Sequence, residues 1–165
     1  MNRFLAIVII AIAATSFVPG ALGEQANPLL GTWTAVAVDD VRPDGSKHPL
    51  MGPDPQGMLV FDAGGRYSVQ LCAADRPKFA ANDRSKGTAD ENRAAVLGCN
   101  PHWGRYVVNE ADKTILFKID HALFTNWEST EQRRVFILAG DELRYSIPNP
   151  SENGANPVIV WKRAK

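Results

Sequence analysis

The chain has 165 residues, of which 45% are hydrophobic and 22% are charged, and its 18 basic and 18 acidic residues balance. It has no run of like charge. The composition therefore excludes an extended basic surface for nucleic acid or for an anionic membrane, because such surfaces need clustered Lys and Arg. The length suits one globular domain with a single core.

The first 23 residues have the pattern of a secretory signal peptide. Asn2-Arg3 supplies a positive end, Phe4–Ala14 is an apolar run, and Ala21-Leu22-Gly23 is a small-x-small cleavage site. The run is too short to span a bilayer, which needs about 20 apolar residues. No second apolar run suggests a later membrane anchor. We therefore expect cleavage after residue 23, a free domain over residues 24–165, and a location in the periplasm or outside the cell.

Export would place the two cysteines in an oxidising compartment. A disulfide between Cys72 and Cys99 is then the default expectation. Two buried thiols are one alternative, and a reactive or metal-binding cysteine is another. Two lone cysteines without a CxxC spacing or a nearby histidine pair make a poor zinc site. We therefore predict a disulfide and no metal site.

Segments of alternating apolar and polar residues, bounded by Gly, Asn and Asp, predict eight strands. They cover Gly31–Asp39, Met58–Phe61, Arg66–Cys72, His102–Asn109, Lys113–His121, Glu131–Leu138, Glu142–Ile147 and Pro157–Arg163. The second and third form a hairpin around Asp62-Ala63-Gly64-Gly65, where glycine tolerates positive φ. The Pro- and Gly-rich connection over residues 40–57 is expected to be a long loop.

Residues 73–98 interrupt the strand pattern. Within them, Thr88–Leu97 has the sequence of a short helix, with Thr88 as its N-cap and Glu91 as its capping-box partner. The simplest fold for this order of elements is an all-β, mostly antiparallel barrel with one helical excursion.

A series of short motifs spans nearly the whole chain after residue 23. They are Leu30-Gly31-Thr32-Trp33, Gly57-Met58-Leu59-Val60-Phe61, Gly64-Gly65-Arg66, Gln70-Leu71, Arg76-Pro77-x-Phe79, Gly104-Arg105-Tyr106, Asn126-Trp127, Gln132-x-Arg134, Gly140-Asp141-x-Leu143 and Trp161-x-Arg163. In order and spacing they resemble the bacterial and fungal lipocalin-like domain family. The resemblance implies an eight-stranded barrel of the calycin type, whose interior holds only side chains or one small ligand.

The resemblance also implies structural roles for Trp33 and Arg163. In lipocalin-like barrels a tryptophan closes one end, and an arginine from a late strand lies over its ring in a cation–π contact worth roughly 0.5 to 2 kcal/mol. Arg134 is the alternative partner for this ring. We assign neither Trp33 nor Arg163 to catalysis.

Polar groups on apolar strand faces are the candidate ligand-binding residues. On the fifth predicted strand, His121 shares a face with Phe117 and the neighbouring isoleucines, so a regular strand would aim His121 toward the lumen or its rim. The alternatives are a core histidine satisfied by one hydrogen bond, or a strand that has already ended. We predict that His121 and Phe117 contact a ligand.

The same period-two argument adds three tyrosines and an arginine. Tyr67, Tyr106 and Tyr145 alternate with aliphatic residues, so each is expected on a buried face, either packed in the barrel or lining a cavity. Arg134 shares the parity of Phe136, so it is expected to point inward, where a charge requires a partner.

A ring of charged, amide and aromatic residues is expected around the mouth of the barrel, made up of Asp75-Arg76, His102-Trp103, Asn126-Trp127 and Gln132-Arg133-Arg134. Trp127 is its predicted ligand contact, and an arginine in this ring could pair with a ligand carboxylate through two parallel hydrogen bonds. A salt bridge within the loops, from Arg76 to its neighbours, is the alternative.

The leading functional interpretation is a non-catalytic exported barrel that binds a small hydrophobic or amphipathic molecule. No nucleophile–base motif and no metal-ligand spacing occurs, so no catalytic residue, cofactor or metal is assigned. The first alternative is a cofactor-free isomerase or cyclase in which His121, Tyr106 or Asp75 moves a proton. The second is a protein-interaction or inhibitor-type barrel with a filled core, which would use the loops over residues 40–57 and 73–98. The sequence assigns no oligomeric state.

Overall fold

The computed structural model describes residues 27–146 and 156–165, and the predicted signal peptide lies outside them. The strands are β1 (Gly31–Val41), β2 (Lys47–Pro49), β3 (Gln56–Phe61), β4 (Arg66–Cys72), β5 (His102–Asn109), β6 (Thr114–Ala122), β7 (Glu131–Ala139), β8 (Glu142–Ser146) and β9 (Asn156–Arg163). The helical elements are η1 (Arg84–Lys86), α1 (Ala89–Leu97) and η2 (Thr125–Trp127).

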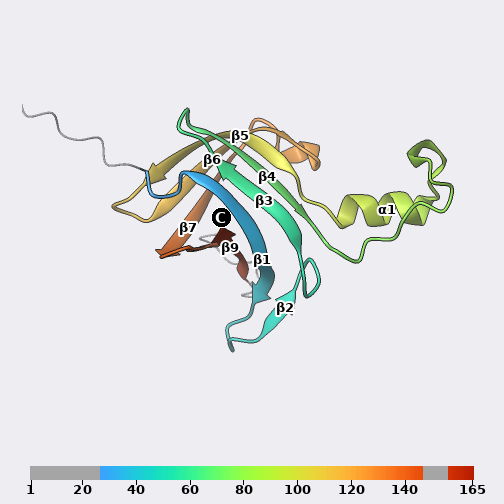
Figure 1. The fold of residues 1–165 in the computed structure, drawn as a ribbon, viewed down its shortest axis with the longest axis horizontal. Helices are drawn as coiled ribbons and strands as arrows, with labels where there is room; N and C mark the ends of the chain where they lie inside the picture. The colour runs from blue at the N-terminus through green and yellow to red at the C-terminus, as the bar shows by residue number, and fades with distance from the viewer. Residues whose placement is uncertain (1–26, 147–155) are drawn as a thin grey trace, which may run out of the picture.

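The strands form one antiparallel sheet in the order β2-β1-β3-β4-β5-β6-β7-β8-β9, and pairing of β1 with β9 closes it (Figure 1). The closed barrel has eight strands, because β2 pairs only with the end of β1. The predicted all-β fold with eight barrel strands and one α-helix is therefore confirmed.

The short strand β2 was not predicted, and the connection over residues 40–57 is not simply a loop. Gly45, with a φ of 81°, forms the turn that brings the chain back, and the N–H of Arg42 donates to the Ser46 carbonyl at 2.9 Å. The N–H of Leu50 then donates to the Val38 carbonyl at 2.8 Å. This hairpin carries residues 50 and 51 over the end of the barrel where β1 finishes.

The opposite end of the barrel, where β1 begins, is filled by side chains. Trp33 is completely buried, and its indole N–H donates to the Leu29 carbonyl at 2.9 Å. Arg163 lies over the Trp33 ring, 4.1 Å from the ring centroid, and donates to the carbonyls of Leu30 and Pro28 at 2.8 Å each. These contacts fold the segment before β1 across this end, and we call it the closed end.

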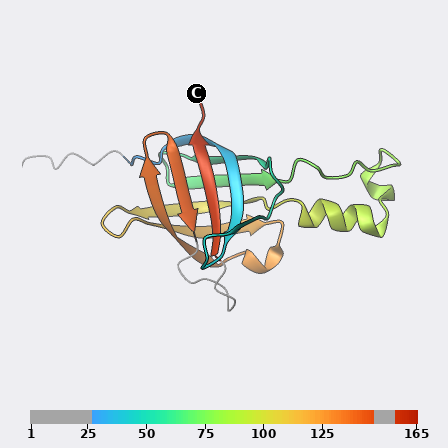
Figure 2. The same cartoon turned by 90° about the horizontal axis from the view of Figure 1, so that it is seen from below.

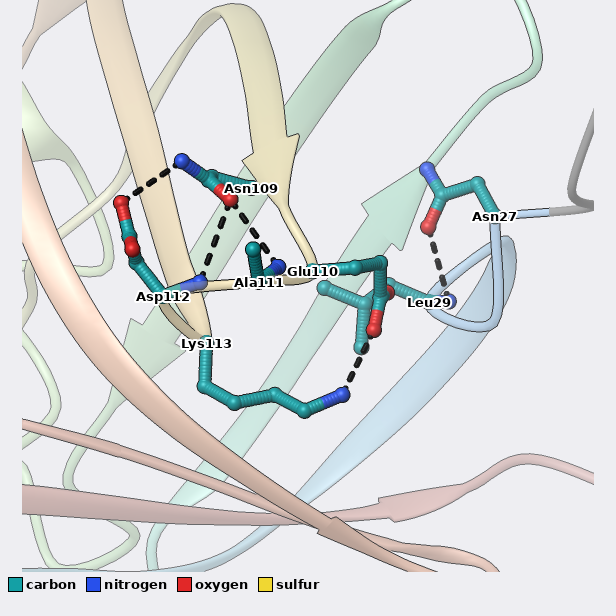
Figure 3. A network of polar contacts seen from close by, with 7 residues as sticks. All are labelled: Asn27, Leu29, Asn109, Glu110, Ala111, Asp112 and Lys113. Carbon is teal, nitrogen blue, oxygen red and sulfur yellow. Dashed lines mark hydrogen bonds and ion pairs between the residues drawn. The ribbon is translucent and has the colours of Figure 1, made fainter.

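Two turns support the closed end, and Figure 3 shows the polar contacts of one of them. In the β5–β6 turn, Asn109 accepts the backbone N–H groups of residues 111 and 112 and donates to Asp112 at 2.7 Å. Asn27, also drawn there, accepts the Leu29 N–H and donates to the Tyr106 hydroxyl at 2.9 Å. Tyr106 in turn donates to the Asp62 carbonyl in the β3–β4 turn.

The segment over residues 73–98 projects away from the barrel as an arm that carries α1 (Figures 1 and 2). No residue of α1 is buried, and the predicted capping box between Thr88 and Glu91 is present. The predicted disulfide joins Cys72 to Cys99 at the base of the arm, beside a hydrogen bond from the Ala73 N–H to the Gly98 carbonyl. The disulfide thus ties the two ends of the arm to each other where they leave the sheet.

A β-bulge in β6 changes which side chains face the interior. Trp103 pairs with His121 and Gly104 with Ile119, so Asp120 is an extra residue without a partner on β5. The bulge reverses the alternation after Ile119. The expectation that His121 points to the lumen or its rim is therefore wrong. Its side chain is 60% exposed on the outer surface, and its ring lies 5.3 Å from that of Trp103.

Gly104 lies opposite this bulge with no room for a side chain. A Cβ at residue 104 would collide with the Lys118 carbonyl oxygen and lie 2.7 Å from the Asp120 nitrogen, and both are backbone atoms. We expect Gly104→Ala to lower the free energy of unfolding by about 1–3 kcal/mol, because β5 and β6 must separate. Urea denaturation measures this change. Gly64→Ala is the control, since its Cβ would be 3.4 Å from the Asp62 carboxylate in an exposed turn; equal losses in both variants would contradict the prediction.

Candidate functional site

The end of the barrel opposite the closed end contains a cavity of about 720 Å³. Its walls include Val38 of β1, Leu71 of β4, Gln132 and Arg134 of β7, Ile159 of β9, and Trp127 of η2. Leu50 and Met51 reach the cavity from the segment that directly follows β2. The volume lies in the range of pockets that enclose one drug-sized molecule. We call this the open-end cavity.

Strand pairing explains why these side chains meet. Val38 pairs with Ile159, so both face the interior, and a bulge at Val36 gives Val38 this orientation. On β7, Gln132 pairs with the buried Phe117, so Gln132 and Arg134 share the inward face. The inward direction predicted for Arg134 thus agrees with the strand register.

Arg134 and Gln132 form the polar wall of the cavity. Arg134 is half-buried, and it donates hydrogen bonds to the Gln132 side-chain oxygen and, at 3.0 Å, to the Arg133 carbonyl. Val38, Leu71 and Ile159 supply apolar surface to the same cavity. Asn100 and Arg133 also line the cavity, so the site combines apolar walls with amide and guanidinium groups, a combination typical of pockets that orient a small molecule.

An aromatic cluster around Phe117 lies in the barrel interior between the closed end and the cavity. The ring of Phe117 lies 4.6 Å from that of Tyr67, 5.9 Å from that of Tyr145 and 6.3 Å from that of His102. The Tyr67 hydroxyl is hydrogen-bonded to Nδ1 of His102 at 2.9 Å, and the His102 ring meets that of Trp127 edge to face at 5.9 Å. The cluster thus connects to the cavity through Trp127.

Burial keeps the titratable members of this cluster neutral. It lowers the pKa of His102 to about 4, an effect that the positive charge of Arg134 reinforces. It also raises the pKa of Tyr145 to about 12 and raises the pKa of Tyr67, although Arg134 opposes both shifts. Burial lowers the pKa of Arg134 itself, yet a guanidinium remains protonated at neutral pH. Arg134 is therefore the charged member of this group.

The other residues predicted to bind a ligand are divided between the two ends and the outer surface. Trp127 lines the open-end cavity, whereas Tyr106 belongs to the closed end, hydrogen-bonded to Asn27 and Asp62. Arg163, and not Arg134, lies over Trp33 at the closed end. His121 lies outside the barrel, with Nδ1 at 3.3 Å from the Glu128 carboxylate. The structure therefore groups Arg134 and Trp127 at one site and separates both from His121.

His102 was not assigned to the interior from the sequence, although a signal was present. It lies two and four residues before Gly104 and Tyr106, so period two places it on the face of Tyr106. Gln132 was placed only near the mouth, and its parity with Arg134 would have brought it inside. Within residues 27–146 and 156–165, no three His, Cys, Asp or Glu side chains lie close enough to hold a metal ion. Of the helices in these ranges, none has the length and apolar composition to cross a membrane.

Comparisons with known proteins find similar solved structures and a matching domain family. Two solved structures are similar to this chain, each at 14% sequence identity. The first is a lipocalin-like protein from Bacteroides uniformis; the match covers 82% of this chain and 98% of that protein, with a TM-score of 0.45. The second is an uncharacterised protein from Bacteroides eggerthii; the match covers 80% of this chain and 98% of that protein, with a TM-score of 0.41. No curated protein matches this chain. The sequence profile of the lipocalin-like domain matches residues 30–164, which is almost the whole described barrel. The chain therefore belongs to the lipocalin-like domain family.

Proposed function

We propose that this protein is exported and binds a small hydrophobic or amphipathic molecule inside the barrel without transforming it. A lipocalin-like barrel is in general a ligand-binding type of domain, and the observation that carries the specific proposal is the open-end cavity of about 720 Å³. Apolar side chains from β1, β4 and β9 face this space, and burial of apolar ligand surface against them would drive binding.

Two observations support export to the periplasm or beyond. The first 23 residues have the pattern of a signal peptide, and Cys72 and Cys99 form a disulfide. Disulfides persist mainly in oxidising compartments. These two features together support the proposed location.

The cavity favours binding over the two alternatives. A barrel acting only through its loops would have a filled interior, whereas here side chains fill the closed end and leave a large space at the other. An isomerase would need an acid or base at the substrate. Of the three groups expected for that role, His121 lies outside, Asp75 is exposed on the arm and Tyr106 packs at the closed end.

A variant that fills the cavity tests the proposal. We expect Ile159→Trp to weaken binding of the neutral fluorescent probe N-phenyl-1-naphthylamine by at least about tenfold, because Ile159 lines the cavity and the larger side chain occupies part of its volume. The matched control is Ile137→Trp, since Ile137 lies on β7 with its side chain 65% exposed on the outside. Fluorescence titration measures both. Equal affinity of wild type and Ile159→Trp, or no probe binding by the wild type, would contradict cavity binding.

A further inference from the structure

Arg134 has no carboxylate partner in the described part of the chain, unlike Arg144 and Arg163. Arg144 on the outer face contacts Glu142 at 2.6 Å, and Arg163 at the closed end contacts Asp141 at 3.6 Å. Among the ion pairs of the described residues, none includes Arg134. A cation withdrawn from water is stabilised by a counterion, so an inward arginine at the cavity favours an anionic ligand.

The groups around Arg134 do not neutralise it. Its two hydrogen-bond acceptors, the Gln132 side chain and the Arg133 carbonyl, are both uncharged. His102, Tyr67 and Tyr145 are neutral at pH 7 for the reasons given above. The remaining N–H groups of the guanidinium have no acceptor among the described residues, and they suit the two oxygens of one carboxylate or phosphate.

Asp40, near the end of β1, is an acidic residue whose strand position brings it toward the cavity. It follows Val38 by two residues and pairs with Pro157, which lines the cavity. Asp40 nevertheless forms no ion pair with Arg134, because the two side chains are not within 4.0 Å. The negative charge that would complete the polar wall is therefore not supplied by this part of the chain.

We propose that the ligand is an amphipathic anion, whose carboxylate or phosphate head pairs with Arg134 and whose apolar body packs against Val38, Leu71 and Ile159. This inference rests on the proposed binding function and specifies its ligand class. The head enters the cavity, because Arg134 lies on the inward face of β7, and the apolar walls around it exclude water from the ion pair. Neutral and cationic ligands with the same apolar body bind more weakly.

Four ligands with the same ten-carbon chain test the ligand class: decanoate, decyl phosphate, 1-decanol and decylamine. Each competes with the neutral probe N-phenyl-1-naphthylamine on the protein purified from its host. We expect at least one anion to bind roughly tenfold or more tightly than the alcohol, and the amine to bind most weakly. The stronger of the two anions distinguishes a carboxylate head from a phosphate head.

Two substitutions assign this preference to Arg134. Arg134→Gln should weaken the preferred anion by roughly ten- to a hundredfold and change the affinity for 1-decanol by less than about threefold. Arg134→Lys keeps the charge and should retain a preference for the anion over the alcohol, which preserves the test if the glutamine variant does not fold. Arg105→Gln is the matched control, because Arg105 is exposed on the outer face of β5, and it should bind all four ligands as the wild type does.

The failures of the two proposals are distinguishable. If wild type binds 1-decanol as tightly as both anions, or if Arg134→Gln binds the anions as wild type does, the anion inference is overturned while cavity binding stands. If neither the probe nor any of the four ligands binds, the proposed binding function fails as well.

Discussion

Trp33→Ala is expected to lower the free energy of unfolding by about 3–5 kcal/mol, the usual loss for a buried aromatic side chain. The indole of Trp33 is completely buried and donates a hydrogen bond to the Leu29 carbonyl. Its ring also supports the Arg163 guanidinium, which holds the carbonyls of Leu30 and Pro28. The substitution therefore removes packing at the closed end and loosens the segment that covers it.

Urea denaturation followed by circular dichroism measures this loss, and Trp103→Ala is its matched control. Trp103 lies on the outer face of β5 and is 47% exposed, so its removal should change the free energy of unfolding by less than about 1 kcal/mol. If Trp33→Ala lowered the free energy of unfolding no more than Trp103→Ala does, the proposed structural role of Trp33 would be contradicted.

The second large effect is a pH dependence of stability that arises from His102. Its side chain is 7% exposed and its pKa is about 4, whereas an exposed histidine in the unfolded chain titrates near 6.5. The unfolded chain therefore binds the proton more readily than the folded one between these two values. Above pH 6.5 His102 is neutral in both states and imposes no penalty.

The sign follows from proton binding: stability falls as the pH falls from about 6.5 to about 4, because protonation favours the unfolded chain. The His102 contribution to this loss reaches roughly 3 kcal/mol for a pKa difference of about 2.5 units. His102→Gln removes this contribution, so its free energy of unfolding should decline less steeply between pH 7 and pH 4 than that of the wild type.

Denaturation curves at several pH values compare these slopes, and His48→Gln is the control for the loss of one imidazole. His48 is exposed on β2, so its variant should follow the wild-type pH dependence. The interpretation of His102 as a buried neutral base would be wrong if the His102→Gln curve ran parallel to that of the wild type.

Local sequence signals were sufficient for the architecture. Strand β4 alternates polar and apolar residues over most of its length, and β4 and β5 have the predicted bounds. The α1 helix begins after Thr88, as its capping box with Glu91 indicated. Such signals act within a few residues, so they can be recognised without knowledge of the three-dimensional fold.

The site depended on features that a strand pattern does not contain. The bulge at Asp120 reverses the alternation of β6 and turns His121 outward, and no residue in the predicted strand marks it. The inward direction of the Arg134 side chain was predictable, because the register of β7 has no bulge between Arg134 and the buried Phe136. Whether the interior is filled depends on side chains from β1, β4, β7 and β9 together, and the sequence alone does not give their combined packing.

Native mass spectrometry of the protein purified gently from its host tests the central claim, that the barrel holds a small molecule in the open-end cavity. The wild type should show a second species heavier by one bound small molecule, and Ile159→Trp, which fills the cavity, should show the mass of the protein alone. The same ligand occupancy in the wild type and in Ile159→Trp, including no bound molecule in either, would contradict binding in this cavity.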